Sequence, residues 1–483
     1  MTNNLPHNEE SHLLDHRHHD ATHKHLDEDV PLYAPPQQRQ RWGDHQMLPH
    51  VNWGDLFFDL FYVAAAHNLA RILEVDPSSE GLLYFCCCYI AVFQVWTDKI
   101  LYSSRYAVDD NFAHRLWEVV QLCVLGTLVQ NIRSARVMSH PAMHPNTMIF
   151  AACVLLDTAL EMLRQVDVIV NVVGGPEAKL NGRADRNVKI VPLLIYLASA
   201  VWAGYDYYFV NSSAPNHFPV VLVVIGVVSE QMMRPYLAVT MMKRGVPFNE
   251  CRVPSNLEFV THRLGEWMML MLGESILSLL IVAESWGNRY FVTFYTGILS
   301  VTLLQYVFFR SQPKAVDDHA FRRNSNAGIL FYISLSIFSA SLIVFGGSYK
   351  LILVQYLDEQ QVANKSHTVV GRAFTLAQRQ GRIANMFSWS LAVSFLSLDI
   401  MTLTHRGLDA NLARYWDKEG KLDRLRVLVS CVNLALLIFS ATLSLWAKRL
   451  EVLSVLGLVV VVAQIFLRTL RMKLFPISKE AHE

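Results

Sequence analysis

Residues 53–71 read WGDLFFDLFYVAAAHNLAR, an apolar stretch that carries Asp55, Asp59, His67 and Arg71. A helix of roughly 20 apolar residues crosses the hydrocarbon core of a bilayer, which is about 30 Å thick. A charged side chain in that core is costly, and it almost always faces the interior of a helix bundle or a wet cavity. The stretch therefore predicts a membrane-spanning helix with one polar face.

Further apolar segments of similar length follow along the chain, and hydrophobic residues make up 52% of the sequence. Charged residues make up 17%, below the roughly 25% of soluble domains, which favours a membrane protein over several soluble domains. We expect an all-α polytopic transmembrane helix bundle of about 12 helices. The candidate spans are Trp53–Leu73, Gly81–Leu101, Phe112–Ile132, Met148–Val170, Ile190–Val210, Phe218–Val239, Leu257–Val282, Tyr290–Phe309, Ala327–Leu353, Phe387–Leu403, Leu425–Trp446 and Leu450–Leu467.

Two tails and two six-helix halves are predicted. Residues 1–50 are polar and rich in histidine, and they are expected to form a disordered cytoplasmic tail because they cannot bury a core. This tail is read either as a solvated segment or as a weak metal-binding tract, since histidine richness is only a compositional signal. The membrane halves are predicted at residues 51–240 and 255–470, and a second cytoplasmic tail at residues 471–483.

The orientation follows from the positive charges, which are concentrated in alternate loops and place both termini in the cytoplasm. The loop around residues 354–386 departs from this pattern with four Lys and Arg residues. Two glycosylation sequons, which start at Asn211 and Asn364, fall in loops assigned to the outside. A net charge of +1 gives no general attraction to nucleic acid, so no nucleic-acid partner is expected.

Ionisable residues of the first predicted helix form a stripe. At about 100° per residue, Asp55, Asp59, His67 and Arg71 fall within about half of the helix circumference. Two acids lie at one end and two bases at the other. Intramembrane ionisable groups relay protons or coordinate cations in many proteins, and a histidine changes charge near physiological pH. A functional role is favoured here, and a structural salt-bridge cluster stays open.

The seventh predicted helix repeats this design, with Glu258, Arg263 and Glu284 beside three further ionisable residues in one sector of the helical wheel. Aligning Gly54-Asp55 with Gly265-Glu266 suggests a 6+6 internal duplication with parallel repeats. The candidate ion- or proton-binding residues of the two helices are Asp55, Asp59, His67, His262, Glu266 and Glu274. Whether they bind a metal is left open.

A second set of polar residues is expected to be structural. Glu230 and Arg234 are four residues apart on one predicted helix and can neutralise each other. Interhelical polar contacts in membranes contribute only about 0.6 kcal/mol on average, which is compatible with a role in holding helices together. This secondary polar core consists of Arg71, Asp157, Glu161, Glu230, Arg234 and Arg263.

The stretch Asp55–Val63 and the segments His262–Gly265 and Leu272–Ser275 resemble the two motifs of the bacterial low temperature requirement protein A family. Members of that family carry Glu where this chain has Asp55 and His262. The resemblance covers most of residues 50–470. It implies a polytopic membrane protein linked to growth in the cold, and little about mechanism.

Three functions are weighed. The first is a transporter or channel for protons or small cations, with a polar site between helices one and seven. The second is a structural membrane protein that binds lipids, whose basic inner loops contact anionic head groups. A membrane enzyme is least favoured, because no nucleophile elbow, paired-histidine zinc motif or phosphate loop is present. No cofactor is expected, and a homodimer stays open because dimers are the commonest symmetric assembly.

Overall fold

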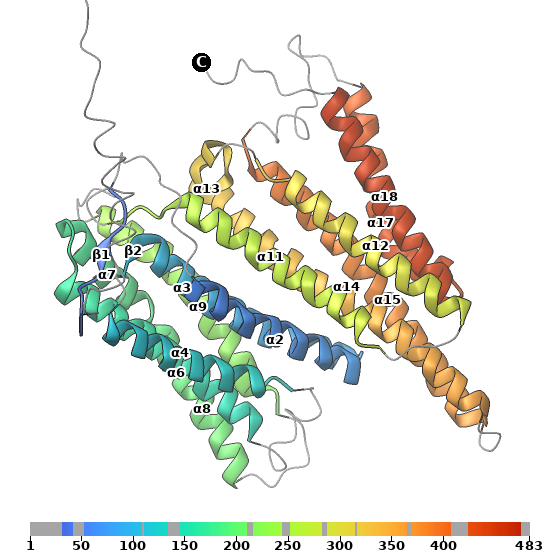
Figure 1. Ribbon diagram of the computed structural model, residues 1–483, viewed down its shortest axis with the longest axis horizontal. Coiled ribbons are helices and arrows are strands. Elements are labelled where there is room, and N and C mark those ends of the chain that lie inside the picture. Colours follow the sequence, from blue (N-terminus) through green and yellow to red (C-terminus); the bar gives the residue numbers. More distant parts are fainter. Residues whose placement is uncertain are drawn as a thin grey trace, which may run out of the picture.

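The computed structural model is an all-α polytopic helix bundle (Figure 1). It describes residues 31–41, 53–108, 111–133, 145–209, 216–243, 252–282, 287–313, 316–364, 369–406 and 424–474. Eleven helices of this part are long and apolar enough to cross a membrane. The seventh predicted span is also a long helix, α11 (Leu257–Leu280), but Arg263, Glu266 and Glu274 in its middle make it less apolar than the eleven candidate spans.

The other long helices match the predicted spans closely. The first half comprises α2 (Trp53–Val75), α3 (Ser79–Arg105), α4 (Phe112–Gln130), α6 (Asn146–Asn171), α8 (Ile190–Phe209) and α9 (Phe218–Lys243). The second half adds to α11 the helices α12 (Asn288–Arg310), α14 (Ser325–Asn364), α15 (Val369–Thr404), α17 (Arg424–Trp446) and α18 (Leu450–Leu474). The two-half organisation and the orientation of the termini stay predictions.

Side-chain caps set the starts of several helices. Ser78 and Asn111 accept hydrogen bonds from the backbone N–H groups of Gly81 and His114, which begins α3 and α4. Asn256 does the same for Phe259 at the start of α11. These oxygens satisfy N–H groups that have no partner inside the helix, so each helix begins at a defined residue.

Two departures from the predicted organisation concern polar segments. Residues 31–41 belong to the tail predicted to be disordered, yet β1 (Gln37–Gln38) pairs antiparallel with β2 (Tyr106–Ala107). The Gln38 N–H also donates to the Val173 carbonyl at 3.0 Å. Backbone hydrogen bonds thus tie this segment to the ends of α3 and α6, whereas residues 1–30 and 42–52 lie outside the described part.

The predicted outer loop around residues 354–386 is mostly helical. The helix α14 has 40 residues, which corresponds to a length of about 60 Å, twice the thickness of a bilayer core. It packs along α15 over much of its length, and both extend past the neighbouring helices (Figure 1). Of the two sequons, Asn211 lies outside the described residues, and Asn364 ends α14.

Helices α2, α11 and α14 lie at the middle of the bundle, where α2 contacts α3, α4, α11 and α14 (Figure 1). A very close approach joins α11 to α14. A Cβ atom at Gly346 would lie 2.6 Å from the Ser275 Cα, so a side chain there would force the helices apart. The Ser275 hydroxyl donates to the Leu342 carbonyl across the same contact. This packing holds the segment around Glu274 against the rest of the core.

Candidate functional site

The first polar layer between α2 and α11 is an ion pair. The Arg263 guanidinium donates from Nη2 to Asp59 Oδ1 at 2.8 Å and from Nη1 to Glu266 Oε2 at 2.6 Å. Asp59 and Arg263 are buried, and Glu266 is partly exposed. His262 approaches Glu266 at 3.4 Å, but half of its side chain is exposed (50%). One arginine therefore joins two carboxylates of different helices at this level.

The second layer lies further along both helices. His67 Nδ1 is 3.1 Å from Glu274 Oε1, and the Ser278 hydroxyl donates to the same oxygen at 2.9 Å. The Glu274 side chain is almost fully buried, and its Oε2 has no hydrogen-bond partner among the described residues. His67 is 33% exposed, so this pair connects a buried carboxylate to a side chain that reaches the surface. A carboxylate oxygen without a partner can still accept a proton or a hydrogen bond.

Aromatic rings fill the space between the two layers. The ring centroid of Trp267 on α11 lies 5.6 Å from that of Tyr62 on α2 and 4.4 Å from that of Trp96 on α3. All three side chains are fully buried. Asp59 and His67 are eight residues apart, or about 12 Å along the helix axis. The aromatic cluster Tyr62–Trp96–Trp267 thus separates one ionisable layer from the other.

The remaining predicted residues of the two helices do not belong to these two layers. Asp55 is 3.9 Å from the Lys99 ammonium, which also lies 3.3 Å from the ring centroid of Phe58. Arg71 is exposed and forms no ion pair with a described residue. It lies one turn after His67, on nearly the same side of α2, but no described acid pairs with it there. Glu284 lies outside the described residues.

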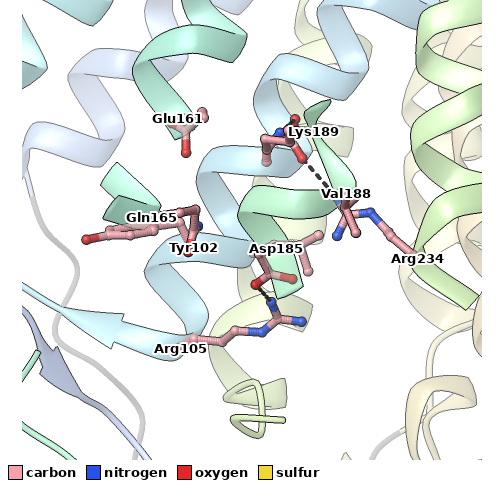
Figure 2. Close-up of a pocket in the computed structure, with 10 residues that line it drawn as sticks. Tyr102, Arg105, Glu161, Gln165, Asp185, Val188, Lys189 and Arg234 are labelled. Carbon is pink, nitrogen blue, oxygen red and sulfur yellow. Dashed lines mark hydrogen bonds and ion pairs between the residues drawn. The ribbon is translucent and has the colours of Figure 1, made fainter. Parts of the chain in front are cut away.

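A second group of buried charges lies where α3 and α9 meet α7 (Pro176–Val188) and the start of α8, and only Glu230 and Arg234 of it are predicted from the sequence (Figure 2). Lys189 donates to Asp98 Oδ2 at 2.6 Å and to Glu230 Oε1 at 3.3 Å. Arg234 donates to Asp98 Oδ1 at 2.9 Å and to Glu230 Oε1 at 2.6 Å. Two acids and two bases therefore neutralise one another, and we call these four residues the charge network.

The charge network continues toward the ends of α3 and α7. Asp185 accepts from Arg105 at 2.6 Å and from Arg252 at 3.0 Å. A cavity of about 320 Å³, counting space open to solvent, is lined by Asp185 and by three of the network residues, and Tyr102 and Glu161 also line it (Figure 2). The Asp98-Lys99 pair inside an apolar span was the available sequence signal, because charges in a span are rarely without a role.

The predicted acids of α6 lie beside this network. Gln121 donates to Asp157 at 3.2 Å and to Glu161 at 3.0 Å. Glu161 also accepts from Arg164 at 2.9 Å, whereas Asp157 forms no salt bridge with a described residue. Both acids are buried, which agrees with a polar core that holds α4 against α6.

Metal-binding geometry is not present in the described ranges, where no group of three or more His, Cys, Asp and Glu side chains could hold an ion. The histidine cluster of the N-terminal tail lies outside these ranges.

A model of the family of the bacterial low temperature requirement A protein (LtrA) matches residues 50–467, nearly all of the helical bundle. The chain belongs to the LtrA family. No curated protein and no solved structure matches it.

The two segments that resemble LtrA motifs are the ones that meet in the candidate site. Asp59 of the first motif pairs with Arg263 of the second, and Glu274 lies in the Leu272–Ser275 segment beside His67. The departure at His262 falls at the exposed edge of the first layer. In this LtrA-family protein the two motifs therefore build one interface between α2 and α11.

Proposed function

We propose that this LtrA-family protein moves protons or small cations across the membrane through the α2–α11 interface. The observation that carries the proposal is the state of Glu274. It is a buried carboxylate with one oxygen bound to His67 and Ser278 and the other without a partner in the described chain. Ionisable groups inside a membrane mark ion pathways and proton relays far more often than chance would place them there.

The arrangement favours alternating access over an open pore. A proton taken up by the partly exposed His67 has a short hydrogen-bonded route to Glu274 Oε1. The aromatic cluster Tyr62–Trp96–Trp267 closes the direct way from there to Asp59. Passage therefore requires the rings to move, and a cation that reaches Asp59 has to replace Arg263 as its partner.

Transport in liposomes tests the proposal. Wild-type protein in vesicles with an internal pH dye and an imposed membrane potential should give proton or cation flux. Glu274→Gln should abolish it, because the amide cannot take up and release a proton. Glu451→Gln is the matched control, since Glu451 lies on α18 and pairs with the exposed Arg289. The proposal fails if wild type is silent for protons, Na⁺ and K⁺ from pH 5 to 8, or if Glu274→Gln transports normally.

A structural, lipid-binding protein that transports nothing is the second candidate. The charge network favours it, because dense mutual neutralisation holds helices together without any ion pathway. This second function would be supported if the folded wild-type protein gave no flux under any condition of the assay.

A further inference from the structure

A second cavity lies between the last turns of α12 and α18, two helices that do not carry the α2–α11 interface. It measures about 210 Å³ including open space, and its lining includes Arg310, Arg468 and Thr469. Val307, Ile465 and Met472 line it as well. The two helices pack against each other, so the cavity is a groove between neighbouring spans with both charged and apolar side chains in its lining. We call it the α12–α18 groove.

Its arginines differ in how firmly they are held. Arg468 donates to Asp399 Oδ1 at 2.6 Å and to the Ser311 hydroxyl at 3.0 Å, and its Nε is buried without a partner in the described chain. Arg310 is exposed and forms no ion pair with a described residue. It contacts only the ring and hydroxyl of Tyr306 on its own helix. Arg310 is therefore free to turn toward a ligand.

Basic side chains gather at this end of the two helices in the described part of the chain. The last turn of α18 adds Arg471 and Lys473 to the two arginines, and Asp399 pairs with Arg468. Two of these four bases, Arg310 and Arg468, line the groove itself. Such a cluster attracts an anion, and the flat guanidinium group is well shaped for a phosphate.

The surroundings of the groove are apolar. Phe309 beside Arg310 is exposed, and so are Val462 and Phe466 on α18, with Phe466 at 69%. Both helices are candidate membrane spans, so these side chains face hydrocarbon, and the arginines at the helix ends lie near the level of the lipid head groups. Basic pockets between spanning helices on the cytoplasmic side are typical sites for anionic head groups.

We infer that the α12–α18 groove binds an anionic glycerophospholipid. Arg310 and the free Nε of Arg468 bind the phosphate, and the Thr469 hydroxyl is a third donor. An acyl chain then lies against Val307 and Ile465, which precede Arg310 and Arg468 by about one turn of their helices. The inference does not depend on transport, because it concerns another pair of helices and a ligand that stays bound.

Lipid binding to the delipidated protein in detergent tests this site. Phosphatidylglycerol should remain bound in native mass spectrometry and raise the unfolding temperature, whereas phosphatidylcholine at the same concentration should do neither. Arg310→Gln should weaken phosphatidylglycerol binding about tenfold, the loss of one charged phosphate contact. This variant should fold normally, because Arg310 has no ion pair in the described chain.

The control is Arg289→Gln at the other end of α12, where the exposed Arg289 pairs with Glu451. It should leave phosphatidylglycerol binding unchanged. Equal binding by wild type and Arg310→Gln would overturn the inference, as would an equal loss in Arg289→Gln. Inorganic phosphate supplies a further arm: if it displaces phosphatidylglycerol at comparable concentration, the groove is a site for free phosphate and the lipid assignment is wrong.

Discussion

The α2–α11 interface and the charge network both bury acids and bases, but they satisfy them in different ways. In the network, Asp98 and Glu230 each accept from both Lys189 and Arg234. At the interface, each layer depends on one cross-helix pair, and Glu274 keeps an oxygen without a partner in the described residues. Each acid of the network therefore has two cationic partners, whereas Glu274 has a single histidine and a serine.

This difference distinguishes charges that stabilise the fold from charges that change their protonation state during transport. A network charge that is neutralised leaves several opposite charges without a partner in an interior that does not solvate them. A carboxylate with no permanently charged partner can gain or lose a proton at smaller cost. The number of partners, more than burial itself, therefore distinguishes the two regions, and this distinction can be measured.

The largest effect is expected for Lys189→Met in the charge network. Removing this ammonium leaves Asp98 and Glu230 with Arg234 as their shared cation. Breaking a buried ion pair from one side costs about 3–5 kcal/mol, so the free energy of unfolding in detergent should fall by that amount. Lys179→Met on α7 is the control, because Lys179 is exposed. Similar unfolding of both variants would show that the network does not hold the fold.

Acid is expected to destabilise the protein through residues outside both regions. His319 and His405 lie between membrane spans, with ring centroids 4.8 Å apart and almost no exposure. Burial lowers the pKa of His319 to about 4, and burial and then the charge of His319 lower the pKa of His405 to about 3. Backbone N–H groups of Phe321 and Ala320 donate to their Nδ1 atoms, which also favours the neutral rings.

The direction of this pH effect on stability follows from proton uptake by the two histidines. The unfolded chain has ordinary histidines that bind protons below about pH 6.5, whereas the folded chain keeps these rings neutral down to about pH 4. The contribution of the neutral histidines to the free energy of unfolding should be fully present above about pH 7. It should be lost between about pH 6.5 and 4, with a loss of about 3 kcal/mol for His319. Thermal unfolding against pH measures this, and His405→Gln should flatten the curve. If His67→Gln flattens it instead, the acid response belongs to the α2–α11 interface.

The sequence predicted the spans and the two charged helices because those signals are local. A run of about 20 apolar residues and a stripe of acids at helical spacing can be read without knowing any neighbour. The partners could not be predicted, since they depend on packing: Asp59 meets Arg263, and Lys189 reaches Asp98 across 91 positions. Arg71 shows the limit, because its place in the stripe did not reveal that its side chain is exposed and without a described acid as partner.

The smallest effect on stability is expected for Glu274→Gln, the variant that should abolish transport. Glutamine keeps the volume of the side chain and an oxygen that can accept from Ser278. The His67 ring can accept from the new amide N–H or donate to the amide oxygen, so it keeps a hydrogen-bond partner. The free energy of unfolding should therefore change by no more than about 1 kcal/mol, the contribution of one hydrogen bond. A loss as large as that of Lys189→Met would mean that Glu274 holds α2 to α11 as firmly as the network holds its helices, and the case for a working carboxylate at this interface would be lost.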